Sequence, residues 1–322
     1  MEPVALLRRI VSIDSVFGNE RKLAEFLERE LKERGFRTRR IPISPGRFSV
    51  VGDRGSRGRP ILLFGHMDTV PPYGKWAGKP TSLRQKGDRL CGLGAFDMKA
   101  GVAAILAATE EKSGRRIRVA FSVDEENISQ GSYAMLRAGA LRGVEAAISA
   151  EISTSKPCLG TGEITLGRRG RCVIEVEVPG RSAHGAQADR GISAISEASR
   201  LVLELDRLNG SLGSHPLLPP PTQFVRRFSA ESTSLSVPET AVIELDRHTV
   251  VPETPESVLR QVRSSITFLY RSGKFSPIDG RRMTARLAPR PNPYLLPYVT
   301  SQGNPSARLL TRIVREKTGR QP

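Results

Sequence analysis

The first half of the chain alternates short apolar runs with amphipathic segments. Residues 18–34 carry apolar side chains at helical spacing, and residues 61–64 form a short, wholly apolar strand. Further along, the pattern predicts a helix at 97–112, a strand at 116–123, a short helix at 129–139 and a strand at 144–151. Strands that alternate with helices favour an α/β fold with a largely parallel sheet and helices on both faces.

The pattern changes after about residue 165. In residues 171–178, Cys172, Ile174, Val176 and Val178 share one face, which is typical of a half-exposed antiparallel strand. The predicted elements that follow are a helix at 191–208, strands at 222–229 and 240–247, a helix at 255–270 and a strand at 281–288. This order is that of an α+β, ferredoxin-like unit. We therefore expect a domain inserted at 166–291 between two parts of a first domain, 1–165 and 292–322.

Acids and a histidine follow several of the predicted strands. His66 and Asp68 come after the strand at 61–64, three carboxylates occupy 124–126, and Glu151 closes the strand at 144–151. Ligands bind beyond the carboxyl ends of parallel strands, so these side chains are expected at one edge of the sheet. Taken singly, His66 and Asp68 are also compatible with a loop histidine and a helix-capping carboxylate. Residues 124–126 are also compatible with a solvated acidic loop.

Asp97 stands at the start of the predicted helix 97–112, after a turn that contains Gly92 and Gly94. One histidine with several carboxylates is a ligand set for borderline divalent metals, with zinc the leading candidate. A carboxylate that bridges two ions would make a two-metal hydrolytic site. Asp68 lies two residues from His66, where it can accept the imidazole N–H and orient the ring.

Composition narrows the picture further. The net charge is +17, but arginine, which supplies 40 of the 50 basic residues, is spread along the whole chain and aromatic residues make up only 5%. We expect a basic, solvated surface and no nucleic-acid partner. The sequence has no long apolar run, so no membrane partner is expected, and the first residues lead us to expect no secretory leader. Three scattered cysteines, Cys91, Cys158 and Cys172, fit a reducing cytoplasm.

Four motifs occur in order: GHMDTVPP, GLGAFDMKAG, VDEE and GRSAHGAQADRGISAI. Together they resemble the dinuclear zinc metallohydrolases that include acetylornithine deacetylase, succinyl-diaminopimelate desuccinylase, aminoacylase and carboxypeptidase G. The resemblance covers nearly the whole chain. It implies hydrolysis of an amide bond in an N-acyl amino acid or small peptide. It also implies that the inserted domain is a lid through which a homodimer forms, and it allows an acidic carrier protein as a partner.

The resemblance also implies roles for individual residues. His66 and Glu151 bind one metal ion, Glu126 binds the other, and Asp97 bridges them, with zinc expected and cobalt or manganese as alternatives. Asp68 orients His66.

Two further roles follow from the resemblance. Glu125 is the general base that takes a proton from the attacking water. His184 is the lid histidine that reaches the site of the partner subunit and donates a hydrogen bond to the developing oxyanion.

Two departures from the family pattern affect these expectations. The lid strand carries Asp246, Arg247 and His248 in succession, so Arg247 is expected to bind a substrate carboxylate and His248 either shares that task or faces the other way. The last metal-binding histidine of the family has no counterpart after His248. We therefore expect a weak second metal site or a sequence shorter than the functional protein. The alternative function is a catalytically impaired relative that serves as a dimerisation or small-molecule-binding protein.

Overall fold

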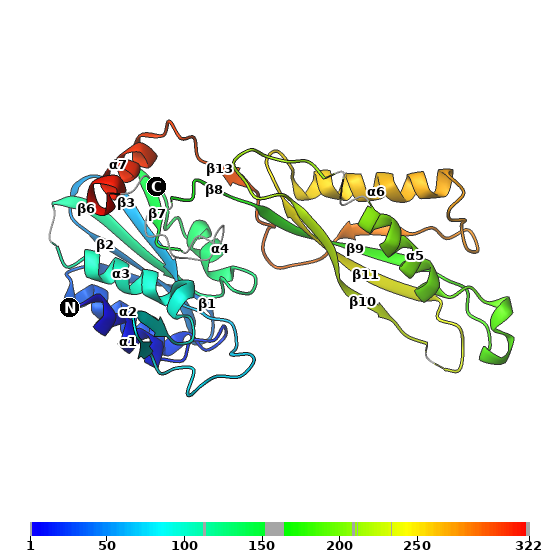
Figure 1. Ribbon diagram of the computed structural model, residues 1–322, viewed down its shortest axis with the longest axis horizontal. Helices are drawn as coiled ribbons and strands as arrows, with labels where there is room; N and C mark the ends of the chain where they lie inside the picture. The colour runs from blue at the N-terminus through cyan, green and yellow to red at the C-terminus, as the bar shows by residue number, and fades with distance from the viewer. Residues whose placement is uncertain are drawn as a thin grey trace. The chain divides into compact units, whose positions relative to one another are not determined.

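The computed structural model describes residues 2–111, 114–151, 164–207, 210, 212–232 and 234–319. The chain divides into two units, Met1–Lys156 and Pro157–Pro322. Cys158 lies outside the described residues. Figure 1 shows the elements of both units along the chain.

The first unit is built on a five-stranded sheet in the order β1-β2-β6-β3-β7. Its strands are β1 (Arg37–Ser44), β2 (Arg47–Arg54), β3 (Arg57–His66), β6 (Arg115–Ser122) and β7 (Ala146–Ser149). β3 pairs in parallel with both β6 and β7, while β1 pairs antiparallel with β2, and β2 with β6. The α/β class is confirmed, and the sheet is mixed rather than largely parallel.

The antiparallel part was not anticipated from the sequence. β1 and β2 are joined by only Pro45 and Gly46, and Gly46 has a positive φ of 77°. So short a connection can only reverse the chain into a neighbouring antiparallel strand, which accounts for the mixed sheet.

Helices cover both faces of this sheet. One face packs against α1 (Pro3–Ser12), α2 (Arg21–Glu33) and α3 (Ala100–Ala108), with Val50, Val119 and Phe121 in the shared core. The other face packs against α4 (Gln130–Arg137), where Val51 and Ala120 are buried. Neighbouring residues of one strand thus enter different cores, as the two-residue period of a strand requires. A small hairpin, β4 (Arg84–Lys86) and β5 (Arg89–Cys91), lies outside the sheet.

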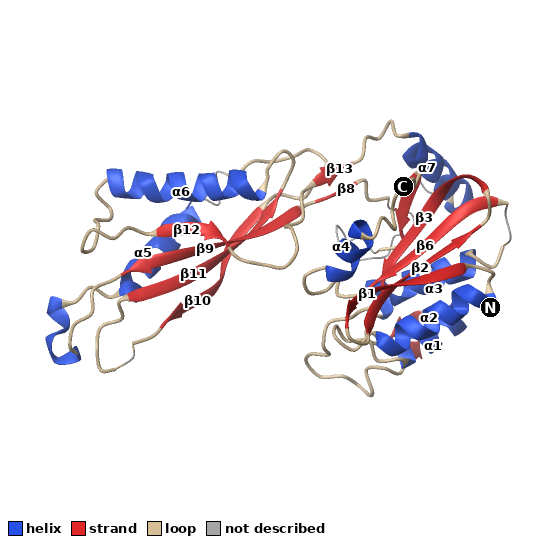
Figure 2. Ribbon diagram, turned by 180° about the vertical axis from the view of Figure 1, so that it is seen from behind, coloured by secondary structure: helices blue, strands red, loops and turns tan. Residues whose placement is uncertain are grey.

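The second unit contains a four-stranded antiparallel sheet in the order β10-β11-β9-β12. The strands are β9 (Gly170–Pro179), β10 (Thr222–Ala230), β11 (Thr240–Thr249) and β12 (Thr284–Leu287), with helices α5 (Ala194–Arg207) and α6 (Pro255–Arg271). Both helices pack on one face, seen from behind in Figure 2, where Cys172, Ile174, Val176 and Val178 are buried. The element order and strand order are those of a ferredoxin-like unit, as the predicted order of elements indicates.

The remaining elements of the second unit are short or terminal. β8 (Gly167–Arg168) pairs with β13 (Tyr298–Val299), a 3₁₀ turn η2 spans Gly185–Arg190, and α7 spans Pro305–Thr318. The assignment of 292–322 to the same domain as 1–165 stays a prediction. Among the residues that the structure describes, no helix is both long and apolar enough to cross a membrane.

Candidate metal centre

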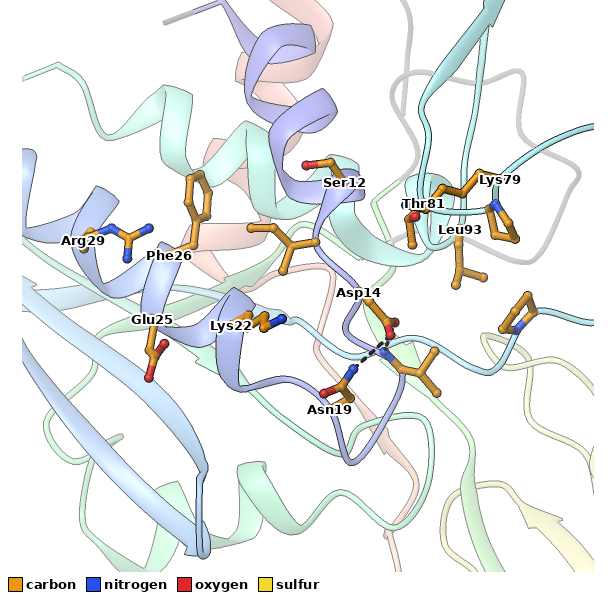
Figure 3. Close-up of a pocket in the computed structure, with 14 residues that line it drawn as sticks. Ser12, Asp14, Asn19, Lys22, Glu25, Phe26, Arg29, Lys79, Thr81 and Leu93 are labelled. Carbon is orange, nitrogen blue, oxygen red and sulfur yellow. Dashed lines mark hydrogen bonds between the residues drawn. The ribbon is translucent and has the colours of Figure 1, made fainter.

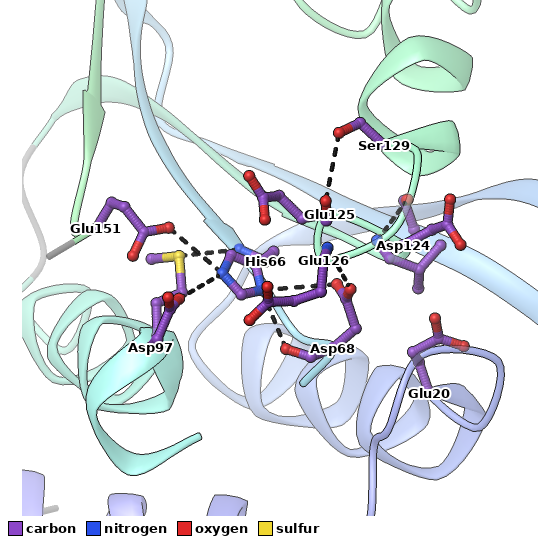
Figure 4. Close-up of polar contacts among 12 residues, drawn as sticks. Glu20, His66, Asp68, Asp97, Asp124, Glu125, Glu126, Ser129 and Glu151 are labelled. Atoms are coloured by element: carbon purple, nitrogen blue, oxygen red, sulfur yellow. Dashed lines mark hydrogen bonds and ion pairs between the residues drawn. The ribbon is translucent and has the colours of Figure 1, made fainter. Parts of the chain in front are cut away.

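The expected acids gather where the parallel strands of the first unit end. His66 is the last residue of β3, Glu125 and Glu126 follow β6, and Glu151 follows β7 by two residues. Because β3, β6 and β7 run in parallel, their carboxyl ends share one edge of the sheet. Asp97 joins them from η1 (Ala95–Lys99), the irregular turn before α3. Figure 4 shows these side chains around the ring of His66.

The ligand atoms lie close together. His66 Nε2 is 3.0 Å from Asp97 Oδ1 and 3.3 Å from Glu151 Oε2. One ligand atom each from His66, Asp97 and Glu126 lie within 4.8 Å of one another. The imidazole is buried, whereas the Asp97 side chain is 46% exposed, so the cluster opens to solvent on the Asp97 side.

The rest of the His66 ring is fixed by its neighbours. Nδ1 lies 3.1 Å from the backbone oxygen of Asp68 and 3.6 Å from its Oδ1. A carbonyl oxygen only accepts hydrogen bonds, so Nδ1 carries a proton and Nε2 is the atom turned toward Asp97 and Glu151. The sequence predicted that the Asp68 carboxylate orients the ring; in the structure the closer contact is the Asp68 carbonyl.

The Asp68 side chain also makes a hydrogen bond to the loop after β6, which the sequence did not predict. Its Oδ2 accepts a hydrogen bond from the backbone N–H of Glu126 at 2.9 Å. Asp68 therefore joins the end of β3 to the loop after β6. Its buried Oδ1 has no hydrogen-bond partner within the described chain.

The cluster places several carboxylates around one imidazole, and this concentration of negative charge favours a bound cation. Burial alone would lower the pKa of His66, but its contacts with Asp68, Asp97 and Glu151 outweigh burial and raise the pKa to about 12. Burial, followed by the charge of Asp97, raises the pKa of Glu126 to about 7. The donor set, one imidazole nitrogen with carboxylate oxygens, fits a divalent metal ion.

Asp97 differs from expectation in its local structure. The helix predicted at 97–112 begins at Ala100 and ends at Ala108. Asp97 has extended dihedrals, φ −114° and ψ 106°, so it belongs to the turn that precedes the helix. Gly101 lets this segment approach β7, because a Cβ there would lie 2.1 Å from the backbone oxygen of Ala150.

Two residues that the sequence did not single out support the loop after β6. The guanidinium of Arg47 contacts Glu20 through two hydrogen bonds, of 2.9 and 2.6 Å, and Asp124 Oδ1 at 3.2 Å. Glu20 and Asp124 are buried. No local pattern marks this network, because its members lie 27 and 77 residues apart in the chain.

The other predicted site residues lie in the second unit. His184 is exposed and caps the start of η2, where its Nδ1 accepts a hydrogen bond from the N–H of Ala186 at 3.2 Å. Arg247 on β11 is fully buried and paired with Glu253, and its Nε and Nη1 have no hydrogen-bond partner among the described residues.

His248, also on β11, lies 3.2 Å from Thr222 Oγ1 through its Nδ1. Burial, together with the charge of Arg169, lowers its pKa. The structure leaves the roles predicted for His184, Arg247 and His248 untested.

A separate hollow of about 780 Å³ lies in the first unit, between the end of α1, the start of α2 and residues 72–93. Figure 3 shows its mixed polar lining, in which Asn19 donates a hydrogen bond to Asp14 at 2.9 Å. His66, Asp97 and Glu126 do not line it. It is therefore distinct from the candidate metal centre.

The chain thus combines a mixed α/β sheet, which carries a histidine and carboxylates at its strand ends, with a ferredoxin-like unit that follows in the sequence. Residues 62–286 match the model of Peptidase family M20/M25/M40, and the chain belongs to this family.

Individual relatives agree with this assignment. Carboxypeptidase G2 from Pseudomonas sp. (strain RS-16) is 34% identical over 62% of this chain and 50% of its own length. A succinyl-diaminopimelate desuccinylase from Paracoccus denitrificans (strain Pd 1222) is 27% identical over 100% of this chain and 84% of its own. The chain spans about half the length of the curated relatives it matches first.

A solved structure shares the fold. The M20 family metallo-carboxypeptidase Sso-CP2 from Sulfolobus solfataricus superposes with a TM-score of 0.75 at 17% identity, over 100% of this chain and 85% of its own.

Proposed function

We propose that the chain is a metal-dependent hydrolase that cleaves the amide bond of an N-acyl amino acid or a small peptide. The observation that supports this most directly is the convergence of His66, Asp97 and Glu126 within 4.8 Å, with Glu151 at 3.3 Å from the same imidazole. Family membership supports the reaction class, and the names of the relatives include both deacylases and peptidases.

Two divalent ions are proposed, zinc first, with cobalt or manganese as alternatives. His66 and Glu151 would hold one ion, Glu126 the other, and Asp97 both. When bound, the ions would polarise the scissile carbonyl and lower the pKa of the attacking water.

Glu125 is the proposed general base. It neighbours Glu126 on the loop after β6, and Figure 4 shows the two carboxylates apart from each other, above and below the His66 ring in this view. One side chain can therefore hold metal while the other takes a proton from water and returns it to the leaving amine.

His184 is proposed to act on the site of a partner subunit, in a homodimer formed through the second unit. Its exposure supports such a reach. The edge strand β10 also exposes Phe224 and Phe228, apolar side chains suited to an interface.

Mixed dimers test this arrangement. Neither His184→Ala nor Glu125→Ala alone should be active, but a mixture of the two has one complete site in each mixed dimer. Dissociation and reassociation in equal amounts should restore about a quarter of the wild-type activity, because half of the dimers are mixed and each has one good site of two. No recovery despite dimer exchange, followed by light scattering, would contradict action across the dimer.

Arg247 and His248 are the proposed contacts for a substrate carboxylate. Arginine suits that role because its planar guanidinium binds carboxylates with two hydrogen bonds. Arg247 is buried and paired with Glu253 in this structure. We therefore propose that His248 is the residue that contacts the substrate carboxylate first. A higher KM for acidic substrates in His248→Ala, with kcat unchanged, is the expected result; an unchanged KM would refute it.

An acidic carrier protein that presents the substrate is the second partner proposed. A groove of about 390 Å³ on the first unit is lined by Arg37, Arg39, Arg116 and Arg118, with Asp53 as its acid. Arg118 pairs with Asp53 at 2.9 Å, whereas Arg37 and Arg39 have no ion pair with any described residue. A Kd for an acidic partner that does not weaken between low and high salt would contradict this proposal.

A cytoplasmic location is also proposed, with which the free thiols of Cys91 and Cys172 agree.

The catalytically impaired alternative stays open as a proposal. A panel of substrates separates an active enzyme from an impaired relative. N-acetyl and N-succinyl amino acids and dipeptides are incubated with the zinc- or cobalt-loaded chain.

Turnover that a chelator abolishes, and that is lost in Asp97→Asn but kept in the exposed control Asp88→Asn, supports the enzyme. Metal binding without turnover of any substrate supports the impaired relative.

A further inference from the structure

A buried ion network lies directly behind the loop that carries the two site glutamates. Arg47, on β2, reaches Glu20 at the start of α2 through Nε and Nη2, at 2.9 and 2.6 Å. The same Nη2 donates to Asp124 Oδ1 at 3.2 Å. Glu20 is 0% exposed and Asp124 is 1% exposed, so Arg47 is the cation that offsets two buried carboxylates.

Asp124 passes this restraint to the loop. Its Oδ2 accepts a hydrogen bond from the N–H of Gln130 at 3.1 Å, and its carbonyl accepts one from the N–H of Ser129 at 2.6 Å. Asp124 and Ser129 both have positive φ, 67° and 58°. Residues other than glycine adopt a positive φ rarely, and the hydrogen bonds at Asp124 and Ser129 stabilise it here.

The loop is tied at a second point, next to His66. Glu126 N–H donates to Asp68 Oδ2 at 2.9 Å. The segment before Glu20 is bound to the residues that follow β3, because Phe17 N–H donates to the Thr69 carbonyl and Thr69 N–H to the Ser15 carbonyl, both at 3.0 Å. One short segment therefore holds the chain just after β3 directly, and it holds the loop after β6 through Glu20 and Arg47.

We infer that Glu20, Arg47 and Asp124 form a positioning network that holds the loop bearing Glu125 and Glu126 against the candidate metal centre. This inference rests on the proposed function for its catalytic consequence. The three residues touch neither substrate nor metal in this account; they act by fixing the loop backbone. The competing interpretation is a buried ion pair that only adds stability.

The chain contains a matched control for that interpretation. Arg40, on β1, also binds an α2 glutamate, Glu28, through Nε and Nη2 at 2.9 and 2.6 Å. Glu28 is buried too, at 7% exposed, but among the described residues it has no hydrogen bond or ion pair with the loop after β6. Arg40→Met thus removes a similar ion pair without touching the loop.

Three measurements on Arg47→Met and Arg40→Met, both in the full chain, test the inference. Hydrogen exchange of residues 124–131 should become at least tenfold faster in Arg47→Met and stay unchanged in Arg40→Met. The Kd for Co²⁺, followed by its visible absorption, should weaken at least tenfold in Arg47→Met alone. With an active wild type, kcat should fall at least tenfold with little change in KM.

Two conservative variants keep the test decisive if Arg47→Met does not fold. Arg47→Lys keeps the positive charge but not the bidentate contact with Glu20. It should give an intermediate hydrogen-exchange rate and an intermediate Co²⁺ affinity. Glu20→Gln should behave in the same way. If Arg47→Met does not fold, these two variants decide the question.

The outcomes separate the two claims. Equal exchange of residues 124–131 in Arg47→Met and Arg40→Met overturns the positioning network, whatever the activity. A wild type that binds no Co²⁺ and cleaves no N-acyl amino acid overturns the proposed function, while the exchange data still judge the network.

Discussion

Replacement of Asp68 tests how the site is assembled, because this side chain contacts two of its parts. Asp68 is 0% exposed. Its Oδ2 accepts the Glu126 N–H at 2.9 Å, and its Oδ1 lies 3.6 Å from His66 Nδ1. Asp68→Asn keeps an oxygen that can accept the Glu126 N–H and removes only the charge, whereas Asp68→Ala removes both contacts.

The expected magnitude follows from these contacts. Partners that orient a metal-binding histidine typically change metal affinity by about 10- to 100-fold, which corresponds to about 1.4–2.7 kcal/mol. The Asp68 backbone oxygen, at 3.1 Å from Nδ1, remains in both variants. We therefore expect Asp68→Asn near the lower end, about tenfold, and Asp68→Ala near the upper end, about 100-fold.

The assay is calorimetric titration of the chelator-treated chain with Zn²⁺ or Co²⁺. Asp53→Asn is the control, because Asp53 is partly buried and paired with Arg118 in a groove that no residue of the metal centre lines. Wild-type affinity in both Asp68 variants would refute the reasoning. A loss in Asp68→Asn as large as that in Asp68→Ala would show that the charge, and not the link to Glu126, is what matters.

Three further predictions follow. Glu125→Gln should keep its metal and lose at least about 100-fold in kcat, since proton transfer by a positioned base contributes about 10²–10⁴-fold; retention of kcat would exclude Glu125 as the base. Gly101→Ala should destabilise the fold by about 1–3 kcal/mol and weaken metal binding, because its Cβ would meet the Ala150 carbonyl at 2.1 Å; wild-type denaturant midpoint and affinity would contradict this. Burial raises the pKa of Cys172 from 9.0 to about 12, against the opposing charge of Arg247, so its protonated thiol favours the folded chain below pH 9 and that contribution is lost as pH rises toward 12. At pH 8, iodoacetamide should modify exposed Cys91 within minutes and Cys172 only after unfolding, as mass spectrometry of peptides would show.

The parts that the sequence predicted are those that local patterns encode. Alternation in 171–178 identified the buried face of β9, and the strand ends identified His66, Glu126 and Glu151 as neighbours. Strand polarity alone brings such residues to one edge, so no knowledge of distant contacts was needed.

The parts that it missed depend on contacts between distant residues. β1 is rich in arginine, so its own sequence does not predict a strand; its extended conformation depends on pairing with β2. The irregular turn at Asp97 depends on close packing against the end of β7, and the Glu20–Arg47–Asp124 network joins three separate elements. A single-sequence pattern carries no signal for either.

The central claim is that the cluster at His66, Asp97 and Glu126 binds divalent metal. The most direct test is elemental analysis of the purified chain after loading with zinc and removal of free metal. His66→Ala is compared with wild type and with the control Glu145→Gln, whose surface ion pair with Arg115 involves none of the cluster residues. The account predicts one to two zinc ions per chain in wild type and control, and a clear loss in His66→Ala. No zinc in wild type, or equal zinc in all three, would contradict it.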